Sequence, residues 1–314
     1  MNTLYMMIGL PASGKGHFAE EIGYGEFAFV VESDAMREKL YGDANVQGNP
    51  VDVFKAVEDK VLSYFEMGQD VVMDATNISY KRRMAFLQKM PKDVRKVAVM
   101  VYCPVAECMD NQRERGRNVP IDIIMRMWKN FDSPFYGEGW DEIRYINNNR
   151  NPIYKPDVKN IWAGMINFAQ DNPNHEFSVG VHCDAVVDNL EVEEFTYESA
   201  VLTVSAKWHD MGKVWTKVFH NMKGETTEIA HYYNHENVGA YEIVGMLLNA
   251  DGIDNPHSYI TDVSSVIRFH MRPYMMFTEK SKDKFSRLVG DRVFNWVIKL
   301  NAADREGKGE GDSE

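Results

Sequence analysis

A glycine-rich loop near the N-terminus constrains the fold of this chain more than any other segment. The loop runs Gly9-Leu10-Pro11-Ala12-Ser13-Gly14-Lys15, directly after the apolar stretch Thr3–Ile8 and before a helical pattern. In a strand–loop–helix of this kind, backbone N–H groups and the positive end of the helix dipole surround phosphate oxygens. The sequence therefore predicts a nucleotide-binding loop at residues 9–16 and a sheet that contains the preceding strand.

The residue after the loop lysine departs from the usual pattern. A Ser or Thr normally stands there, and its hydroxyl holds Mg²⁺. This chain has Gly16 instead. Lys15 can still reach the terminal phosphates of ATP. Either Mg²⁺ is held through water and carboxylates, or catalysis is weakened.

Strand and helix patterns alternate through residues 1–150, which predicts an α/β domain with a parallel sheet covered by helices on both faces. Short β-branched runs occur at 28–32, 70–73 and 96–102, and helical patterns at 34–41, 52–66, 80–90, 105–115 and 121–131. Residues 132–160 are rich in Gly, Asn and Pro and are interpreted as loop and linker. The stretch from Ile161 to the end shows helical periodicity without strand alternation, which predicts an all-α second domain over residues 151–314.

Length and composition fit two globular domains. The chain has 314 residues, of which 44% are hydrophobic and 26% charged, as in ordinary globular proteins. A net charge of −12 argues against binding of long duplexes by counterion release, so any nucleic-acid contact should be to an end or a short single strand. No membrane-span pattern or leader is present and the three cysteines form no disulfide framework, so we expect a cytoplasmic protein without a membrane partner.

Polar residues follow the second and third predicted strands, where active sites gather in open parallel sheets. Asp34 and Arg37 follow the second strand, and Asp74-Ala75-Thr76-Asn77 ends the third. A carboxylate at position 34 can accept the proton of an attacking hydroxyl in phosphoryl transfer; the alternative is a helix cap by Ser33 or Asp34. Asp74 is expected near Mg²⁺ or the acceptor, with Thr76 and Asn77 as polar contacts; the alternative is a helix cap by Asn77.

Two basic clusters belong to the same half of the chain. Arg113, Arg115 and Arg117 follow the last predicted strand and are candidates for a lid over the transferring phosphate, although an isolated arginine cluster is usually a solvated face. Lys81-Arg82-Arg83 lies close after the Asp74 motif, beside the proposed acceptor site.

The order and spacing of these motifs over residues 1–135 resemble the phage-type polynucleotide 5′-kinase domain. The resemblance implies that Lys15 binds the β- and γ-phosphates, Asp34 is the general base on a 5′-hydroxyl, Arg37 orients the acceptor phosphate, and Arg115 is the lid arginine. Thr76-Asn77 and Val119-Pro120 also occur in related small-molecule P-loop kinases, so the acceptor class stays open.

The second half carries an ordered series of metal-ligand residues in helical segments or at their ends. The series is His182, His209, Asp210, His235, His270 and Asp304. Each histidine alone is more often an ordinary core or surface group. Helices of a bundle can direct such side chains into one cavity, and imidazole with carboxylate suits Mn²⁺, Fe²⁺, Co²⁺ or Ni²⁺.

The local contexts of these residues resemble the HD phosphohydrolase superfamily over residues 165–306. The matching stretches are Asn172–His182, Trp208-His209-Asp210-Met211-Gly212-Lys213, Asn234–Ala240, Ile267–Pro273 and Asn301–Arg305. The resemblance implies a first metal on His182, His209, Asp210 and Asp304. His235 and His270 either hold a second metal bridged by Asp210 or contact the substrate phosphate.

Further residues of this half are candidates for supporting roles. Lys213 is expected to neutralise phosphate. On a helix, His231 would share the face of His235 and could substitute as a ligand. Additional candidates for phosphate contacts are His175, Arg268, Arg272 and Arg305.

The two resemblances together suggest an enzyme that heals RNA or DNA ends. The kinase would phosphorylate a 5′-OH with ATP and Mg²⁺, and the hydrolase would remove a 2′,3′-cyclic phosphate or a 2′- or 3′-phosphate with one or two transition metals. A separate ligase could then seal the ends. The alternatives are a small-molecule or nucleoside kinase fused to a nucleotidase, which the acidic charge favours, and a nucleotide-sensing regulator. The two basic clusters favour end healing.

Overall fold

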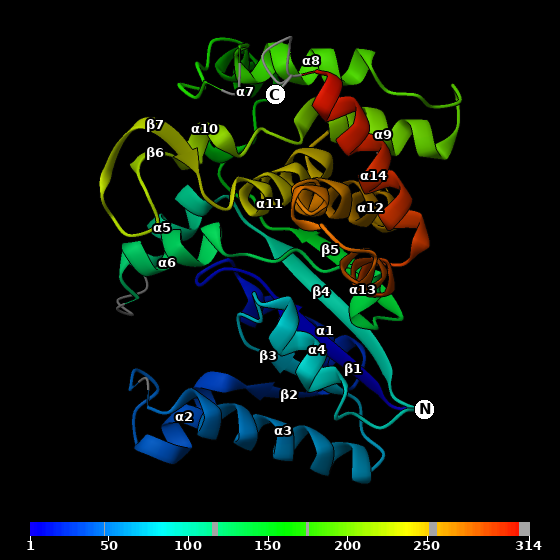
Figure 1. The fold of residues 1–314 in the computed structure, drawn as a ribbon. Coiled ribbons are helices and arrows are strands. Elements are labelled where there is room, and N and C mark those ends of the chain that lie inside the picture. Colours follow the sequence, from blue (N-terminus) through cyan, green and yellow to red (C-terminus); the bar gives the residue numbers. More distant parts are fainter. Residues whose placement is uncertain (47, 115–118, 174–175, 251–255, 308–314) are drawn as a thin grey trace. The chain divides into compact units, whose positions relative to one another are not determined.

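The computed structural model describes residues 1–46, 48–114, 119–173, 176–250 and 256–307 (Figure 1). The chain divides into two compact units. Unit 1 comprises Met1–Met127 and Glu138–Lys155, and unit 2 comprises Trp128–Gly137 and Pro156–Glu314. The predicted boundary at residue 150 differs from this division mainly in the segment 128–137, which joins unit 2. That residues 1–150 and 151–314 are separate domains stays a prediction.

Unit 1 is built on a parallel sheet of five strands, in the order β2-β3-β1-β4-β5. The strands are β1 (Thr3–Ile8), β2 (Phe29–Glu32), β3 (Val71–Asp74), β4 (Arg95–Tyr102) and β5 (Glu142–Asn147). All six residues of β1 are buried, as expected for a central strand covered on both faces. The predicted parallel sheet is confirmed.

Helices cover the sheet of unit 1 on both sides. The helices in this part of the chain are α1 (Lys15–Gly25), α2 (Ser33–Tyr41), α3 (Pro50–Glu66), α4 (Tyr80–Leu87), α5 (Val105–Glu114) and α6 (Ile121–Lys129), with short 3₁₀ turns η1 (Tyr136–Glu138) and η2 (Pro152–Tyr154). The end of α6 and the start of η1 belong to unit 2. On one face, Ala19 of α1 packs against a cluster that includes Tyr5 and Met7. Right-handed crossovers put α3 on the other face, because the chain moves along the sheet in the opposite direction there.

The interpretation of residues 132–160 as loop and linker is wrong for strand β5. Strand β5 pairs with β4 in parallel register, from Glu142 opposite Val97 to Asn147 opposite Tyr102. Ile143 and Tyr145 are 1% and 5% exposed and alternate with polar residues, which is the pattern of a half-buried strand. The surrounding Gly, Asn and Pro residues masked this short alternation.

Unit 2 is mainly helical, as predicted. Its helices are α7 (Val158–Ile166), α8 (Val179–Asp188), α9 (Tyr197–Trp208), α10 (Lys213–Thr216), α11 (His235–Leu248), α12 (His257–Phe269), α13 (Glu279–Val289) and α14 (Asp291–Glu306), with a 3₁₀ turn η3 (Pro273–Met275). Helix α11 forms the centre, because ten of its residues are buried. Gly290 separates α13 from α14 with φ 80°.

The expected absence of strands in the second half is wrong at one place. Strands β6 (Lys217–His220) and β7 (Thr226–Tyr232) form an antiparallel hairpin with an irregularity between Val218 and His220. Gly224, with φ 83°, lies in its turn.

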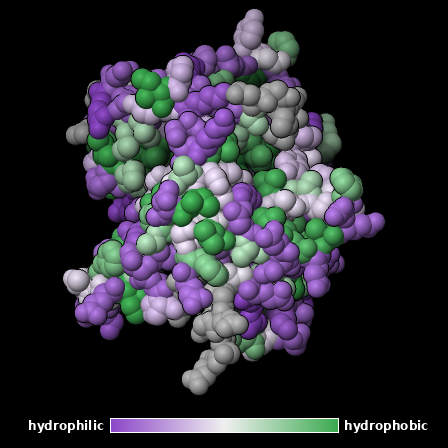
Figure 2. Space-filling view, turned by 90° about the horizontal axis from the view of Figure 1, so that it is seen from above, coloured by the Kyte–Doolittle hydropathy of each residue, from purple (hydrophilic) through white to green (hydrophobic). Residues whose placement is uncertain are grey.

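None of the described helices is long and apolar enough to cross a membrane. The face in Figure 2 mixes hydrophilic residues with small hydrophobic patches.

A buried ion pair ties α4 to the segment that leads into β5. Nε and Nη2 of Arg83 donate to the two carboxylate oxygens of Glu138 at 2.7 and 2.6 Å, and both side chains are 0% exposed. Nε1 of Trp140 donates to the same carboxylate at 3.1 Å. The use of Arg83 as a basic residue beside an acceptor site is therefore wrong, whereas Lys81 and Arg82 are exposed.

We predict that Arg83→Met destabilises the protein by about 3–5 kcal/mol, because the substitution leaves the Glu138 carboxylate buried without its cation. Urea denaturation measures the free energy of unfolding. The matched control is Arg82→Met, at the exposed neighbouring position, which should change it by less than about 0.5 kcal/mol. Equal effects of the two substitutions would contradict the structural role of the pair.

Candidate functional site

The glycine-rich loop of unit 1 is held from behind by two asparagines. Nδ2 of Asn148 donates to the Ser13 carbonyl at 2.8 Å, and Nδ2 of Asn111 donates to the Ala12 carbonyl at 3.2 Å. Gly14 has φ 89°, and a Cβ there would lie 2.3 Å from Nδ2 of Asn148. Only glycine fits this position, for both reasons. Sequence reasoning did not find the two asparagines, which lie far along the chain.

A cavity of about 360 Å³ lies beside this loop. Nine predicted residues line it: Pro11, Ala12, Gly14, Lys15, Gly16, Asp34, Arg37, Asp74 and Thr76. Unpredicted lining residues include Glu32, Phe54 and Gln112. Gly9 and Ser13 do not line the cavity. Gly9 packs so closely that a Cβ would lie 2.8 Å from Oγ of Ser13 and 2.9 Å from the Val101 carbonyl.

Lys15, Asp34 and Arg37 face the same cavity from two different helices. The ammonium of Lys15 donates to the Leu10 carbonyl at 2.7 Å, so it lies against its own loop. The guanidinium of Arg37 forms an ion pair with Asp34. Neither Ser33 nor Asp34 is the N-cap residue of α2, which is Glu32. The alternative of a helix cap is therefore wrong, and Asp34 is directed to the cavity.

Asp74 lies next to the position of the missing loop hydroxyl. A Cβ on Gly16 would stand 3.4 Å from Oδ2 of Asp74, so a serine side chain would have room there beside the carboxylate. Glu32 is the register partner of Asp74 on the neighbouring strand, and both residues line the cavity. Two carboxylates therefore stand at the carboxyl ends of adjacent strands, near the place where a P-loop normally holds Mg²⁺.

Asn77 does not cap α4, and the one described arginine of the predicted lid, Arg113, does not line the cavity. Nδ2 of Asn77 donates to the Met7 carbonyl at 2.8 Å, and α4 has Ser79 as its N-cap residue, so the alternative of a cap by Asn77 is wrong. Arg113 pairs with Asp110 on α5 with its side chain 61% exposed and does not line the cavity. Arg115 and Arg117 lie outside the described residues.

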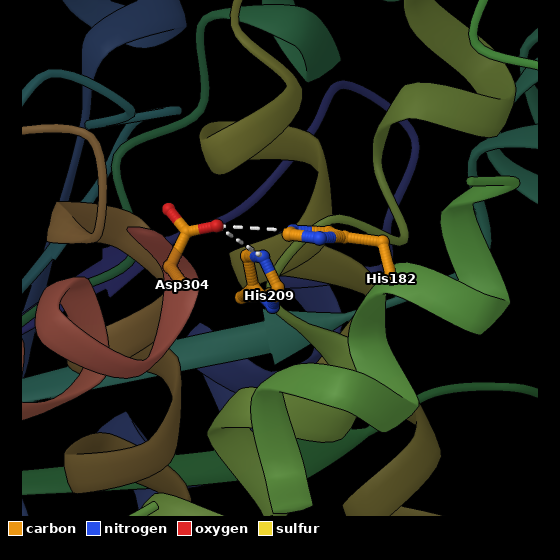
Figure 3. A group of neighbouring side chains, drawn as sticks. All are labelled: His182, His209 and Asp304. Carbon is orange, nitrogen blue, oxygen red and sulfur yellow. Dashed lines mark ion pairs between the residues drawn. The ribbon is translucent and has the colours of Figure 1, made fainter. Parts of the chain in front are cut away.

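The six predicted metal-ligand residues of unit 2 meet in one buried site. His182 comes from α8, His209 ends α9, Asp210 follows it, His235 begins α11, His270 ends α12 and Asp304 lies on α14. Their potential ligand atoms form two groups with mutual distances within 4.8 Å, namely His182 with His209 and Asp304, and Asp210 with His235 and His270. Figure 3 shows the first group with both imidazoles directed at the Asp304 carboxylate.

The two oxygens of Asp210 divide between the two groups. Oδ2 lies 3.7 Å from Nε2 of His182 and 3.5 Å from Nε2 of His209. Oδ1 lies 3.3 Å from Nε2 of His235 and 3.6 Å from Nε2 of His270. This carboxylate therefore stands between two sets of imidazoles, as a ligand that bridges two cations would.

Backbone carbonyls orient all four imidazoles in the same way. Each Nδ1 lies 2.7–3.1 Å from a carbonyl oxygen, and the acceptors are Gly307 for His182, Ala206 for His209, Tyr232 for His235 and Ile267 for His270. When Nδ1 carries the proton, Nε2 keeps its lone pair, which is the usual arrangement of a metal-binding histidine. Nε2 of His235 and of His270 are 3.1 Å apart, so two lone pairs would repel there without a proton or cation between them.

Burial and charge together tune this site. Burial lowers the pKa of His209 to about 4, so its imidazole is neutral near pH 7 and can act as a ligand. Burial would raise the pKa of Asp210, but Lys213 and His209 hold it well below the usual value. Burial also raises the pKa of Tyr274, whose hydroxyl donates to Oδ2 of Asp304 at 2.7 Å. Tyr274, which sequence reasoning missed, thereby leaves Oδ1 of Asp304 to the histidines.

A second cavity, of about 270 Å³, opens onto this site. Its lining includes Asp210, Lys213, His235, His270 and Asp304, together with Tyr274 and residues of β7. The ammonium of Lys213 lies 2.6 Å from Oδ2 of Asp210 and donates to Oε1 of Gln170 at 2.8 Å. The ammonium of Lys213 therefore borders the cavity beside the Asp210 carboxylate.

Several supporting residues are placed differently from the expectation. His231 lies on strand β7, not on a helix with His235, so the shared helical face is wrong. Arg268 pairs with Asp132. Arg268, Arg272 and Arg305 do not line the cavity. His175 lies outside the described residues.

Close packing of glycine brings the His209–Asp210 turn against α11. A Cβ on Gly212 would lie 2.0 Å from the His235 carbonyl and 2.9 Å from the Gly239 amide. No side chain fits at that distance. The glycine two residues after Asp210 therefore determines how closely the two groups of ligands approach.

Residues 4–134 match the family model of the AAA domain. The matched range contains the glycine-rich loop between β1 and α1 and four of the five strands of the parallel sheet. No curated protein matches the chain.

Solved structures with similarity include kinases and an RNA repair complex. A putative kinase from Chloroflexus aurantiacus J-10-fl is 14% identical, with 51% of this chain and 91% of that chain covered and a TM-score of 0.38. A chain of the Pnkp1/Rnl/Hen1 RNA repair complex is 23% identical, with coverages of 41% and 43% and a TM-score of 0.38. A gluconokinase from Sinorhizobium meliloti 1021 is 14% identical, with coverages of 48% and 85% and a TM-score of 0.36. The chain thus spans less than half of the RNA repair protein.

We predict that Gly212→Ala abolishes tight binding of divalent metal, because the added methyl group pushes the His209–Asp210 turn away from His235. Metal content after gel filtration, measured by inductively coupled plasma mass spectrometry, tests this. The matched control is Gly164→Ala on α7, where a Cβ meets nothing within 4 Å and alanine should stabilise the helix by up to about 1 kcal/mol. Wild-type metal content in the Gly212 variant would contradict the close-packing argument.

Proposed function

We propose that this chain is a bifunctional enzyme that heals the ends of cleaved RNA. Unit 1 would transfer the γ-phosphate of ATP to a 5′-hydroxyl, and unit 2 would remove a 2′,3′-cyclic phosphate or a terminal 2′- or 3′-phosphate. The observation that carries the proposal is the convergence of four histidines and Asp304, from five helices or their ends, around the Asp210 carboxylate, in the same chain as a P-loop.

The kinase half is supported by the residues that share the unit 1 cavity. Lys15 and the loop amides would bind the phosphates of ATP. Asp34 would accept the proton of the attacking hydroxyl, and Arg37, its ion-pair partner, would contact the phosphate next to that hydroxyl. Asp74 and Glu32 would hold Mg²⁺, directly or through water, in place of the hydroxyl that Gly16 lacks.

The hydrolase half is supported by the donor set of unit 2. His182, His209, Asp210 and Asp304 would hold one divalent cation, and His235 and His270 with Asp210 a second. A cation bound there would supply Lewis-acid chemistry and a water with a lowered pKa. Lys213 would bind a non-bridging phosphate oxygen, and Tyr274 would hold the Asp304 carboxylate in the orientation that the histidines need.

A nucleoside or small-molecule kinase joined to a nucleotidase is the second candidate. The net charge of −12 favours it, because an acidic protein repels a polynucleotide. The burial of Arg83 favours it too, because this guanidinium cannot contact a phosphate backbone. The two candidates differ in the acceptor, so substrate competition separates them. A purely regulatory P-loop would show ATP binding without transfer.

We predict that an RNA with 5′-OH and 2′,3′-cyclic phosphate ends is modified at both termini when ATP, Mg²⁺ and Mn²⁺ are present. Asp34→Asn should lower 5′-phosphorylation by about 100- to 10,000-fold, as expected for loss of a general base, and leave removal of the cyclic phosphate unchanged. Gel analysis of end-labelled RNA scores both termini. Phosphorylation of free nucleosides in preference to the RNA would favour the second candidate.

We predict that wild type binds two divalent cations per chain and that His235→Ala and His270→Ala each reduce this number to one. Asp210→Asn should lose both and abolish hydrolysis while 5′-phosphorylation continues, because this carboxylate belongs to both groups. Isothermal titration with Mn²⁺ gives the stoichiometry. The control His257→Ala removes an exposed histidine outside the cavity and should change nothing. One cation in wild type would assign His235 and His270 to phosphate binding.

A further inference from the structure

Three rings form a ladder on the β6–β7 hairpin, and we refer to His220, Tyr233 and His231 as the ring ladder. The rings of His231 and Tyr233 are nearly parallel, with an angle of 7° and centroids 5.4 Å apart. The rings of His220 and Tyr233 are stacked at 29° and 6.4 Å. His231 lies in β7, and Tyr233 is the first residue after the strand.

The ring ladder borders the metal cavity. His231 and Tyr233 line the same cavity of about 270 Å³ as Asp210, His270 and Asp304. The two rings are half-buried, and His220 at the end of the ladder is exposed. A planar group that enters the cavity beside the proposed metal ligands therefore meets an aromatic wall.

The neighbouring Tyr232 is not part of the ring ladder and contacts Gln170 and Lys213 instead. Its hydroxyl donates to the Gln170 carbonyl, and the Lys213 ammonium lies 5.4 Å from its ring centroid. Tyr232 thus supports the cation beside Asp210. In the described part of the chain the His231 side chain makes no hydrogen bond to a protein group, and the Tyr233 hydroxyl donates to the His220 carbonyl at 3.4 Å.

We propose that the ring ladder is a stacking platform for the base of a nucleotide whose phosphate lies at the metal site. Aromatic faces bind bases of any sequence by stacking. The proposal rests on the proposed hydrolase function and specifies its substrate class, namely nucleotides or RNA ends in preference to phosphate esters without a base.

The test compares a nucleoside 2′,3′-cyclic phosphate with methyl ribofuranoside 2′,3′-cyclic phosphate, which lacks the base, on the metal-loaded enzyme. Tyr233→Leu should raise KM for the nucleotide about tenfold, the size expected for one stacked base, and leave KM for the base-free ester and both kcat values unchanged. Phe195→Leu, at a side chain that is 100% exposed in the same unit, is the matched control.

Quenching of 2-aminopurine riboside fluorescence supplies a readout that does not depend on hydrolysis. Wild type should quench the fluorophore and Tyr233→Leu should not. Equal KM changes for both esters, or quenching that survives the substitution, would overturn the platform. Failure of wild type to hydrolyse either ester would overturn the proposed hydrolase function instead, while the quenching result still decides the platform.

Discussion

Asp210 brings a carboxylate into a site where only 2% of the residue is exposed, and a buried charge is tolerated only when nearby groups compensate it. Lys213 supplies one full positive charge at 2.6 Å. Four imidazoles surround the same two oxygens, each held by a backbone carbonyl. The ends of α9 and α12 and the start of α11 must therefore lie where their side chains reach this carboxylate, which determines the arrangement of the helices around it.

The precision of that arrangement comes from small residues and backbone groups as much as from the ligands. Gly212 lets the turn after Asp210 approach the first residue of α11. The Nδ1 contacts of His209, His235 and His270 each reach the carbonyl three residues earlier, so the helix end or turn itself orients the ring. Tyr274 adds the corresponding restraint on Asp304. A ligand set on flexible loops would pay the entropy of ordering at each binding event.

Unit 1 obtains its site from a different source, the common edge at which parallel strands end. Lys15, Asp34 and Asp74 follow three strands that are neighbours in the sheet, so their side chains meet although 59 positions separate the first and last of them by number. The loop itself depends on Asn148 and Asn111 behind it. Gly16 lies beside Asp74, so the sheet places a carboxylate next to the position where the loop lacks a hydroxyl.

The sequence by itself determined the features that depend on short-range patterns. These are the strand–loop–helix at residues 3–25, the alternation that predicts the parallel sheet, and the choice of the six residues whose potential ligand atoms the structure brings together. Only the tertiary structure showed that β5 and the β6–β7 hairpin exist and which carbonyls contact the imidazoles. It also showed that Arg83 is buried in an ion pair, with a carboxylate partner 55 residues away. The physical reason is that pairing, burial and ring orientation depend on groups distant in the chain, which no local pattern specifies.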